Sequence, residues 1–237
     1  AVEQLRSFLQ TELDKGRLEG GSIRMFSTCS RIAAVVEGIP NKQPDRKELV
    51  TGAPKKVALT PEGTLSKAGE SFLAKNGITE YFFEETEKGE VIAGWKEEKG
   101  SEIQEVISEI VKNGIRSLNF RKSMRWGEHK FPFARPIRWI FLSINGNPVA
   151  DKFEEIDFSL HSFGHRFLAN GPLTVSASDY EEILKGHYVT ADRDVRKKMI
   201  KESVSAIAQK QQFIANIEEN LLNEVTDMVE YPYVIEG

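Results

Sequence analysis

Residues 121–138, which read RKSMRWGEHKFPFARPIR, are the most informative stretch of this chain. They contain six lysines or arginines and one glutamate, whereas the whole chain has a formal net charge of -4 at pH 7. Gly127, Pro132 and Pro136 prevent a continuous helix, so we expect a fixed loop that leads into a strand. Such a loop suits phosphates and unstacked bases, because cations bind the nucleic-acid backbone while aromatic rings and guanidinium planes stack on bases.

The same stretch also has a purely structural interpretation. Trp126 and Phe133 would anchor the loop in a hydrophobic core, and the arginines would bridge to acidic neighbours within the fold. Composition alone does not separate the two hypotheses.

The composition of the whole chain limits the classes of protein to consider. Its 237 residues can bury a sizeable core as one large domain or two smaller ones. A hydrophobic content of 40% and a charged content of 29% are typical of a soluble globular protein. The negative net charge argues against a protein that coats nucleic acid in general, so any nucleic-acid contact requires a local basic patch such as 121–138.

Three features bear on cellular location. The single cysteine, Cys29, cannot form an internal disulfide, which fits a reducing cytoplasm. The longest apolar run, 139–144, is too short to cross a bilayer, and charges near the N-terminus argue against a signal peptide. We therefore expect a soluble cytoplasmic protein without membrane contact. Because the chain starts within a helical pattern and lacks an initiator Met, we also expect a fragment of a longer protein.

Hydrophobic periodicity and turn residues predict an α+β fold with a mixed or antiparallel sheet, flanking helices and further helices at the C-terminus. We expect two parts, an α+β region over 1–190 and a helical segment over 191–237. The expected helices cover 2–15, 64–75, 101–116, 178–186, 192–214 and 218–229. The expected strands cover 22–27, 31–37, 81–83, 91–95, 137–144, 149–153, 173–176 and 187–190, with a hairpin turn at 87–90 and a loop at 41–54.

The helix over 192–214 carries many cations near its N-terminal half. The residues predicted to face the core are Val195, Met199, Val204, Ile207 and Gln211. The cations placed on the other faces are Arg193, Arg196, Lys197, Lys198 and Lys201. A solvated face is the simplest interpretation, and contact with RNA is the alternative.

The residues give no named candidate for catalysis or for a metal site. His161 and His165 are four residues apart, but Gly164 lies between them and no carboxylate or cysteine follows at ligand spacing. Cys29 has no histidine near it in the sequence, and a Gly-rich phosphate loop is missing, so no ATP site is visible. Residues 164–168 are predicted to be a second ordered loop, whose Arg166 would contact either RNA or a carboxylate inside the fold.

The sequences MRWGEH at 124–129 and FARPIRW at 133–139 resemble, without a gap, the "KSMRWGDH…FVRPIHWL" stretch of the bacterial glycyl-tRNA synthetase β subunit. The similarity covers most of the chain, since TCSRIA at 28–33 resembles the family's "TPRRLA" and GHRFL at 164–168 repeats its "GHRFL". Cys29-Ser30 departs from the family's Pro-Arg, and the family's "LLEIGTEELP" and C-terminal regions are missing. The resemblance is therefore to an N-terminal fragment.

This resemblance implies a subunit of an α2β2 ligase that joins glycine to tRNA(Gly) with ATP and Mg²⁺. The α subunit of that family performs adenylation, whereas the β subunit serves tRNA recognition and assembly, so ATP and Mg²⁺ would belong to the whole enzyme and not to this chain. Part of the family's β subunit is also similar to the B3/B4 module of the phenylalanyl enzyme's β subunit, an α+β fold used there for editing.

On this resemblance we expect tRNA binding and assembly, with no catalytic centre in the chain itself. The alternatives are editing-type hydrolysis of mischarged tRNA and a purely structural module that contacts the α subunit. Seven side chains are expected to contact tRNA, with the tryptophan either stacking on a base or anchoring the loop. They are Lys122, Arg125, Trp126, Lys130, Arg135, Arg138 and Arg166.

Overall fold

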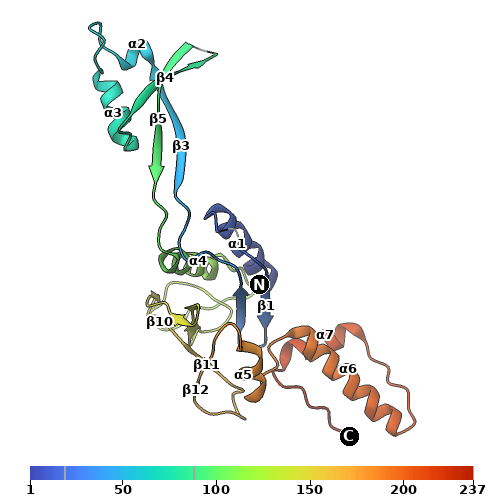
Figure 1. The fold of residues 1–237 in the computed structure, drawn as a ribbon. Helices are drawn as coiled ribbons and strands as arrows, with labels where there is room; N and C mark the ends of the chain where they lie inside the picture. The colour runs from blue at the N-terminus through green and yellow to red at the C-terminus, as the bar shows by residue number, and fades with distance from the viewer. Residues whose placement is uncertain (19, 88, 237) are drawn as a thin grey trace. The chain divides into compact units, whose positions relative to one another are not determined.

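The computed structural model describes residues 1–18, 20–87 and 89–236. The chain forms two compact units, one made of residues 1–40 with the chain from 104 onward, and the other made of residues 41–103 (Figure 1). Both units combine helices with small, mostly antiparallel sheets, so the predicted α+β class is confirmed. The sequence predicted a boundary near residue 190, which is a different division from these two units. That boundary stays a prediction.

The 41–103 unit is a three-stranded antiparallel sheet covered by two helices. The strands lie in the order β3 (Arg46–Pro54), β5 (Gly89–Glu98) and β4 (Tyr81–Thr86), and α2 (Lys55–Ala58) and α3 (Lys67–Asn76) pack against them. The predicted β4–β5 hairpin is confirmed, although Lys88 of its predicted turn lies outside the described residues.

The prediction of a loop over 41–54 was wrong, because Arg46–Pro54 is the longer edge strand of this sheet. The charged residues at the start of β3 interrupt the alternation of apolar and polar residues that would indicate a strand. In the register of the sheet, Lys47 lies opposite Glu97 with an ion-pair distance of 3.0 Å, and Glu48 lies opposite Lys96. Opposite charges across neighbouring strands favour the pairing. The start of β3 is therefore favoured by oppositely charged residues on β5, and not by hydrophobic alternation.

The first core of the larger unit lies under the β1–β2 hairpin. The predicted N-terminal helix and hairpin are confirmed as α1 (Val2–Lys15), β1 (Ile23–Ser27) and β2 (Ile32–Val36). The hairpin packs with α5 (Tyr180–Gly186) and the antiparallel pair β11 (His161–Phe163) and β12 (Pro172–Thr174). The buried side chains of this core are Phe26, Val35, Leu173, Val175, Tyr180, Leu184, Val189 and Ala191.

A second core lies between α4 (Ile103–Ser117) and a small sheet. That sheet joins β6 (Ile140–Phe141) in parallel to β10 (Ile156–Ser159), which pairs antiparallel with β9 (Lys152–Phe153). The predicted single strand over 137–144 was wrong, because it divides into β6 and β7 (Ser143–Ile144), and β7 turns back onto β8 (Asn147–Pro148). The centre of this core is Ile140, Phe153 and Phe158.

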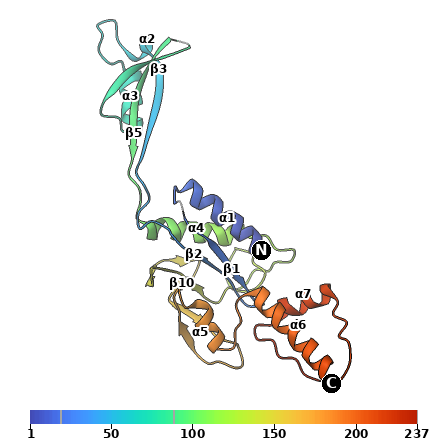
Figure 2. The ribbon, with the colours of Figure 1, turned by 45° about the vertical axis from the view of Figure 1, so that its right-hand side comes forward.

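The chain ends in two packed helices, α6 (Arg193–Lys210) and α7 (Glu219–Met228), drawn in orange and red in Figure 2. The predicted start of α6 is confirmed, since the Asp192 carboxylate accepts the N–H groups of Asp194 and Val195 at 2.8 and 3.0 Å. The predicted strand over 187–190 was wrong: these residues follow α5 as a turn with Tyr188 at a φ of 59°.

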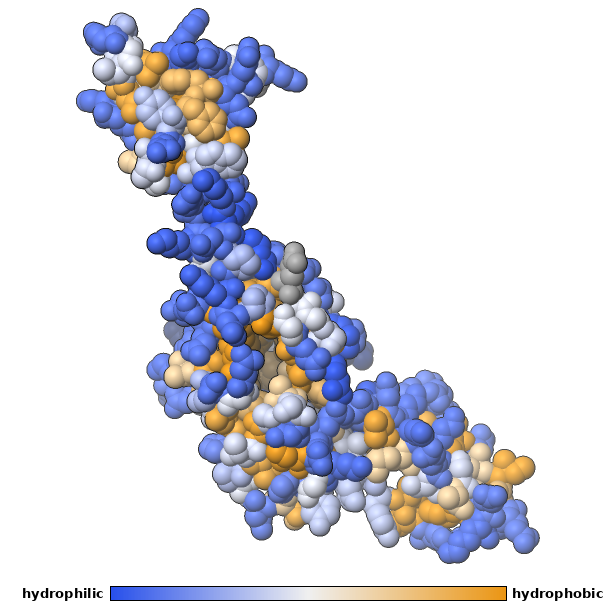
Figure 3. Space-filling model, in the orientation of Figure 1, coloured by the Kyte–Doolittle hydropathy of each residue, from blue (hydrophilic) through white to orange (hydrophobic). Residues whose placement is uncertain are grey.

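Several apolar side chains are exposed on α7 and in the segment that joins α6 to α7. Phe213, Ile214 and Met228 are 69%, 98% and 72% exposed, and Figure 3 shows apolar surface over the α6–α7 region. Within the described residues, none of the helices is both long and apolar enough to span a membrane.

Candidate nucleic-acid interface

The 121–138 stretch forms a braced excursion of the chain between α4 and β6. Met124 and Phe133 exchange both backbone hydrogen bonds, with N···O distances of 2.8 and 3.0 Å. At the tip, the N–H of His129 donates to the carbonyl of Trp126 at 3.1 Å, and Gly127 adopts a φ of 54°. A residue with a side chain is strained at that φ, so glycine suits this turn. The expectation of a fixed loop leading into a strand is confirmed.

A row of aromatic rings fastens this excursion to the second core. The Phe131 ring meets the buried Phe153 ring edge-on at 5.2 Å, and Phe133 lies between Phe131 and Phe120 at 5.9 and 4.7 Å. Trp126 is half-buried at the outer end of the row, 6.5 Å from Phe131. These are the contacts of an anchor. A stacking role for Trp126 stays a prediction.

The six cations expected at the interface share one property: all are exposed and none forms an ion pair with a carboxylate of the described residues. They are Lys122, Arg125, Lys130, Arg135, Arg138 and Arg166. Cations elsewhere in the same unit do pair, for example Lys112 with Asp151 at 2.7 Å. Bridges from this loop to acidic neighbours, as the structural interpretation required, are therefore missing within the described part of the chain.

Two of these arginines lie beside aromatic rings. The Arg138 guanidinium carbon is 5.3 Å from the centre of the Trp139 ring, and that of Arg166 is 5.4 Å from the centre of Phe167. The Trp139 ring in turn meets the Phe163 ring edge-on at 5.0 Å. The structure thus connects the end of the 121–138 stretch with β11, the strand that precedes Arg166.

A buried ion pair between Arg31 and Glu230, which sequence reasoning missed, lies beneath this connection. The Arg31 Nε atom donates to the Glu230 carboxylate at 3.1 Å, and its Nη1 donates to the Phe163 carbonyl at 2.7 Å. The Arg31 guanidinium also lies 5.8 Å from the Trp139 ring centre. Arg31 therefore ties the β1–β2 turn to both segments that carry exposed cations.

Glu230 is held in its charged form by several donors. Burial would raise the pKa of its carboxyl, but the Arg31 charge and the hydroxyls of Ser30 and Thr28, each 2.6 Å from Glu230 Oε1, outweigh burial and lower that pKa. The Glu230 carbonyl also accepts the N–H of Thr190 at 2.8 Å. The carboxylate is thus an ionised junction that several donors hold in place.

Arg196, placed by the sequence pattern on a solvated face of α6, is in fact fully buried. Its guanidinium donates to the carbonyls of Thr190, Ala191 and Ser27 at 2.7, 3.0 and 2.7 Å. Burial lowers the pKa of this guanidinium, and nearby Asp227 opposes that effect. The carbonyl groups take the place of a carboxylate partner, so Arg196 joins α6 to β1.

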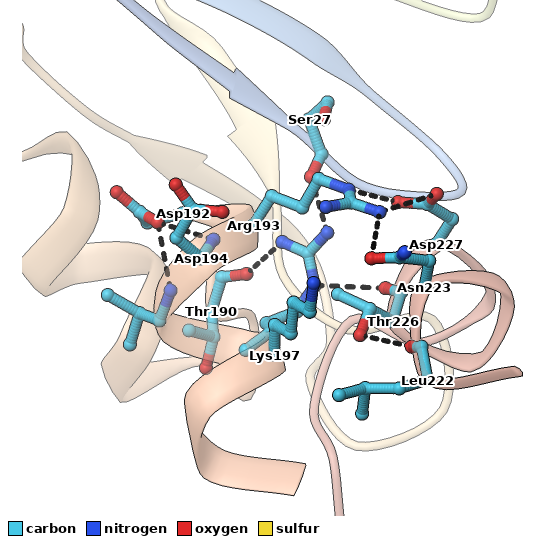
Figure 4. Close-up of polar contacts among 12 residues, drawn as sticks. Ser27, Thr190, Asp192, Arg193, Asp194, Lys197, Leu222, Asn223, Thr226 and Asp227 are labelled. Carbon is cyan, nitrogen blue, oxygen red and sulfur yellow. Dashed lines mark hydrogen bonds and ion pairs between the residues drawn. The ribbon is translucent and has the colours of Figure 1, made fainter. Parts of the chain in front are cut away.

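The other α6 cations are mostly paired on the surface. Figure 4 shows Arg193 directed at Asp227, with distances of 2.6 and 3.0 Å from its Nε and Nη2 atoms. Lys197 pairs with Glu219, and Lys198 lies 3.7 Å from Glu202. These contacts agree with a solvated, ion-paired face of α6, and contact of this helix with RNA gains no support from them.

No reactive group stands out near the interface. Cys29 lies exposed in the β1–β2 turn, where partial burial of its thiol and the Glu230 charge raise the pKa of the thiol and so disfavour the reactive thiolate. His165 donates its backbone N–H to the carbonyl of His187 at 2.9 Å, which matches the prediction of an ordered loop. Among the described residues, no group of three or more histidine, cysteine or acidic side chains is placed to hold a metal ion.

The site is an α+β scaffold whose loops carry exposed cations, some beside aromatic rings and without a carboxylate partner among the described residues, and many RNA-binding proteins present surfaces of this kind. Comparison with known proteins makes the assignment specific. The family model of the glycyl-tRNA synthetase beta subunit matches residues 1–237. The chain is 35% identical over its whole length to the glycine–tRNA ligase beta subunits of Geobacter sulfurreducens and Clostridioides difficile, and equally so to that of Streptococcus suis.

This chain belongs to the glycyl-tRNA synthetase beta subunit family. It covers 35% of the length of each of these three relatives, so it spans about a third of the curated proteins that it matches. The resemblance seen in the sequence is confirmed.

Proposed function

We propose that this chain is a tRNA-binding and assembly portion of the β subunit of a glycine–tRNA ligase. The whole enzyme would join glycine to tRNA(Gly) with ATP and Mg²⁺ as a cytoplasmic α2β2 assembly, and the α subunit would carry adenylation. The relatives' names support a ligase with at least two kinds of subunit. We assign no catalytic centre to this chain, and among the described residues no group of three or more histidine, cysteine or acidic side chains is placed to hold a metal ion.

The observation that carries the proposal is the set of six exposed cations on braced loops, none of which pairs with a carboxylate of the described residues. A cation without a carboxylate partner keeps its full charge for a ligand, and a rigid loop loses little conformational entropy when it binds. Lys122, Arg125, Lys130, Arg135, Arg138 and Arg166 are the proposed contacts to tRNA phosphates or bases. Trp126 is proposed to hold the loop, with stacking on a base as its second possible role.

The similarity of this region to the B3/B4 module of the phenylalanyl enzyme, with an α+β portion over 1–190 and helices over 191–237, forms part of the proposal. The α+β class of the fold supports it. Editing hydrolysis is the alternative function: it requires a group that activates water against an ester, and we assign no residue of this chain to that role.

The test is a double replacement, Arg125→Ala with Arg135→Ala, in the assembled α and β subunits. We expect tRNA(Gly) binding to weaken, and the slope of log K against log salt to fall by about 1.5 units, because two phosphate contacts are lost. Glycine activation should not change. A matched control, Arg6→Ala with Lys15→Ala on α1, removes the same charge from ion-paired cations and should leave tRNA affinity within about twofold.

Three results would contradict the proposal. Unchanged tRNA affinity in the Arg125 and Arg135 variant would show that these two arginines do not contact tRNA. Loss of α–β association in the same variant, with tRNA affinity of the remaining complex intact, would assign these cations to subunit assembly. Deacylation of mischarged tRNA by the wild-type chain above background would assign it an editing activity.

A further inference from the structure

We propose that the β11–β12 loop and Trp139 form a stacking site for unpaired nucleotides of the RNA, with Phe167 as its outermost ring. This inference rests on the proposed function. It adds which kind of RNA structure is bound, and it names aromatic rings that were not among the residues predicted to contact tRNA. The Phe167 residue is 80% exposed, compared with 37% for Phe163 in β11, and Leu168 beside it is 53% exposed.

The loop is built to hold this exposed ring in place. The N–H of Ala169 donates to the carbonyl of His165 at 3.0 Å, and the N–H of Phe167 points to the His165 ring nitrogen at 3.3 Å. Gly164 lies so close to His187 that a Cβ atom there would be 2.9 Å from the His187 carbonyl oxygen. The exposed phenyl ring is therefore not the end of a loosely held loop. The hydrogen-bonded backbone thus holds Phe167 and Leu168 exposed side by side, which leaves the phenyl ring accessible to a ligand.

The groups around the ring indicate what it binds. Arg166 lies over Phe167, and Arg138 lies over Trp139, and neither arginine pairs with a carboxylate in the described part of the chain. A partner protein with a plain apolar surface would leave both charges without a counterpart. A nucleotide supplies a flat base for the ring and a phosphate for the guanidinium in one unit.

The same geometry favours unpaired nucleotides over a duplex. Bases inside a helix are already stacked and shielded, so a ring on a protein loop can reach only bases that are free at an end, a bulge or a loop. Trp139 and Phe163 meet edge-on at 5.0 Å, and Arg31 fixes them from below through the Phe163 carbonyl. The Arg138–Trp139 and Arg166–Phe167 pairs thus lie on two segments that both contact the buried Arg31.

The test uses the assembled α and β subunits and two probes, a single-stranded RNA of about 12 nucleotides, within the usual site sizes, and a blunt RNA duplex of equal length. Phe167→Ala should weaken binding of the single strand about tenfold and leave the duplex within about twofold. The slope of log K against log salt should not change, because no charge is lost. Phe167→Trp keeps an aromatic face and should bind the single strand as the wild type does.

Leu168→Ala is the matched control, because it removes a neighbouring exposed apolar side chain that has no aromatic face. It should bind both probes normally. Equal losses on both probes, or no loss on the single strand, would overturn the inference. Reduced α–β association in both the Phe167→Ala and Leu168→Ala proteins would overturn it too, in favour of a protein-docking surface. If only the Arg125 and Arg135 variant weakens tRNA binding, the proposed function stands and this inference fails.

Discussion

The side chains of Arg31 and Glu230, 199 residues apart in the sequence, form a buried ion pair with a distance of 3.1 Å between Nε and Oε1. Their side chains are 5% and 6% exposed, and the carboxylate also accepts the hydroxyls of Thr28 and Ser30. This junction holds together the β1–β2 turn, the β11 end and the segment after α7. The exposed cations near it are therefore positioned by a charge pair that solvent does not reach.

Removing one member of this pair should destabilise the larger unit strongly. Arg31→Met leaves the Glu230 carboxylate buried without its counter-charge, and such losses cost about 3–5 kcal/mol. Chemical denaturation followed by circular dichroism measures the change. Lys198→Met is the control, since its pair with Glu202 is exposed and should contribute less than about 1 kcal/mol. Similar losses for the two variants would show that the Arg31 pair is solvated.

Two arginines on one turn of α6 offer a second comparison. Arg196→Met should leave the carbonyls of Thr190, Ala191 and Ser27 without their donor, at a cost of at least about 3 kcal/mol. Arg193→Met removes only a partly exposed pair with Asp227, for about 1 kcal/mol. Urea unfolding of both variants tests the difference. If Arg193→Met cost as much as Arg196→Met, the buried carbonyl contacts would carry no special weight.

Local signals in the sequence predicted some of the element ends. Asp192 begins α6 as an N-cap, and Gly77 ends α3 in the left-handed conformation, since only a few residue types make these contacts or adopt that backbone. The 121–138 loop was predicted from Gly127 and its prolines for the same reason. Helix caps and turns of this kind depend on residues that are only a few positions apart in the sequence.

Features that depend on distant partners could not be predicted in this way. The β3 strand pairs its charges with β5, some fifty residues on, and Arg31 meets a glutamate near the other end of the chain. Arg196 did leave a signal, because it lies four residues before Ile200 on the same helical face, and that face is the buried one. The predicted core face was wrong at Val195 and Gln211, which are exposed, because an arginine was not expected inside; its members Met199, Val204 and Ile207 are partly buried.

Asp151 should titrate far below an ordinary aspartate. A hydrogen bond from Lys112 at 2.7 Å, helped by Ser108 and the Lys152 N–H, lowers the pKa of its carboxyl to about 2. A lowered pKa stabilises the folded state above the ordinary value of 3.8, and this contribution is lost as the pH falls from about 4 to about 2. NMR titration of the Asp151 carboxyl measures the pKa directly.

The matching variant for this titration is Lys112→Met. Without the ammonium group, the pKa of Asp151 should rise toward its ordinary value, and the stability difference from the wild type should shrink as the pH falls below about 4. Asp151→Asn should show the same loss of pH dependence. An unchanged Asp151 pKa in Lys112→Met would mean that Ser108 and the backbone are sufficient to lower it.

The close approach of Gly164 to its neighbours gives the last prediction. A Cβ atom at this position would lie 2.6 Å from the Ala169 Cβ and 2.9 Å from the His187 carbonyl oxygen. Gly164→Ala must therefore displace the β11–β12 loop, at a cost of about 1–3 kcal/mol. Because this loop carries Arg166 and Phe167, single-stranded RNA should also bind more weakly to the variant.

Gly186→Ala is the control for this loop, since a Cβ at the end of α5 would meet open space and alanine favours a helix. It should unfold at the same temperature as the wild type or slightly higher, and it should bind RNA normally. Thermal unfolding and RNA titration of the two alanine variants together separate strain at the loop from a general effect of replacing glycine. A Gly164→Ala protein as stable as Gly186→Ala would show that the loop moves without cost, and its exposed ring would then lack the braced position that stacking requires.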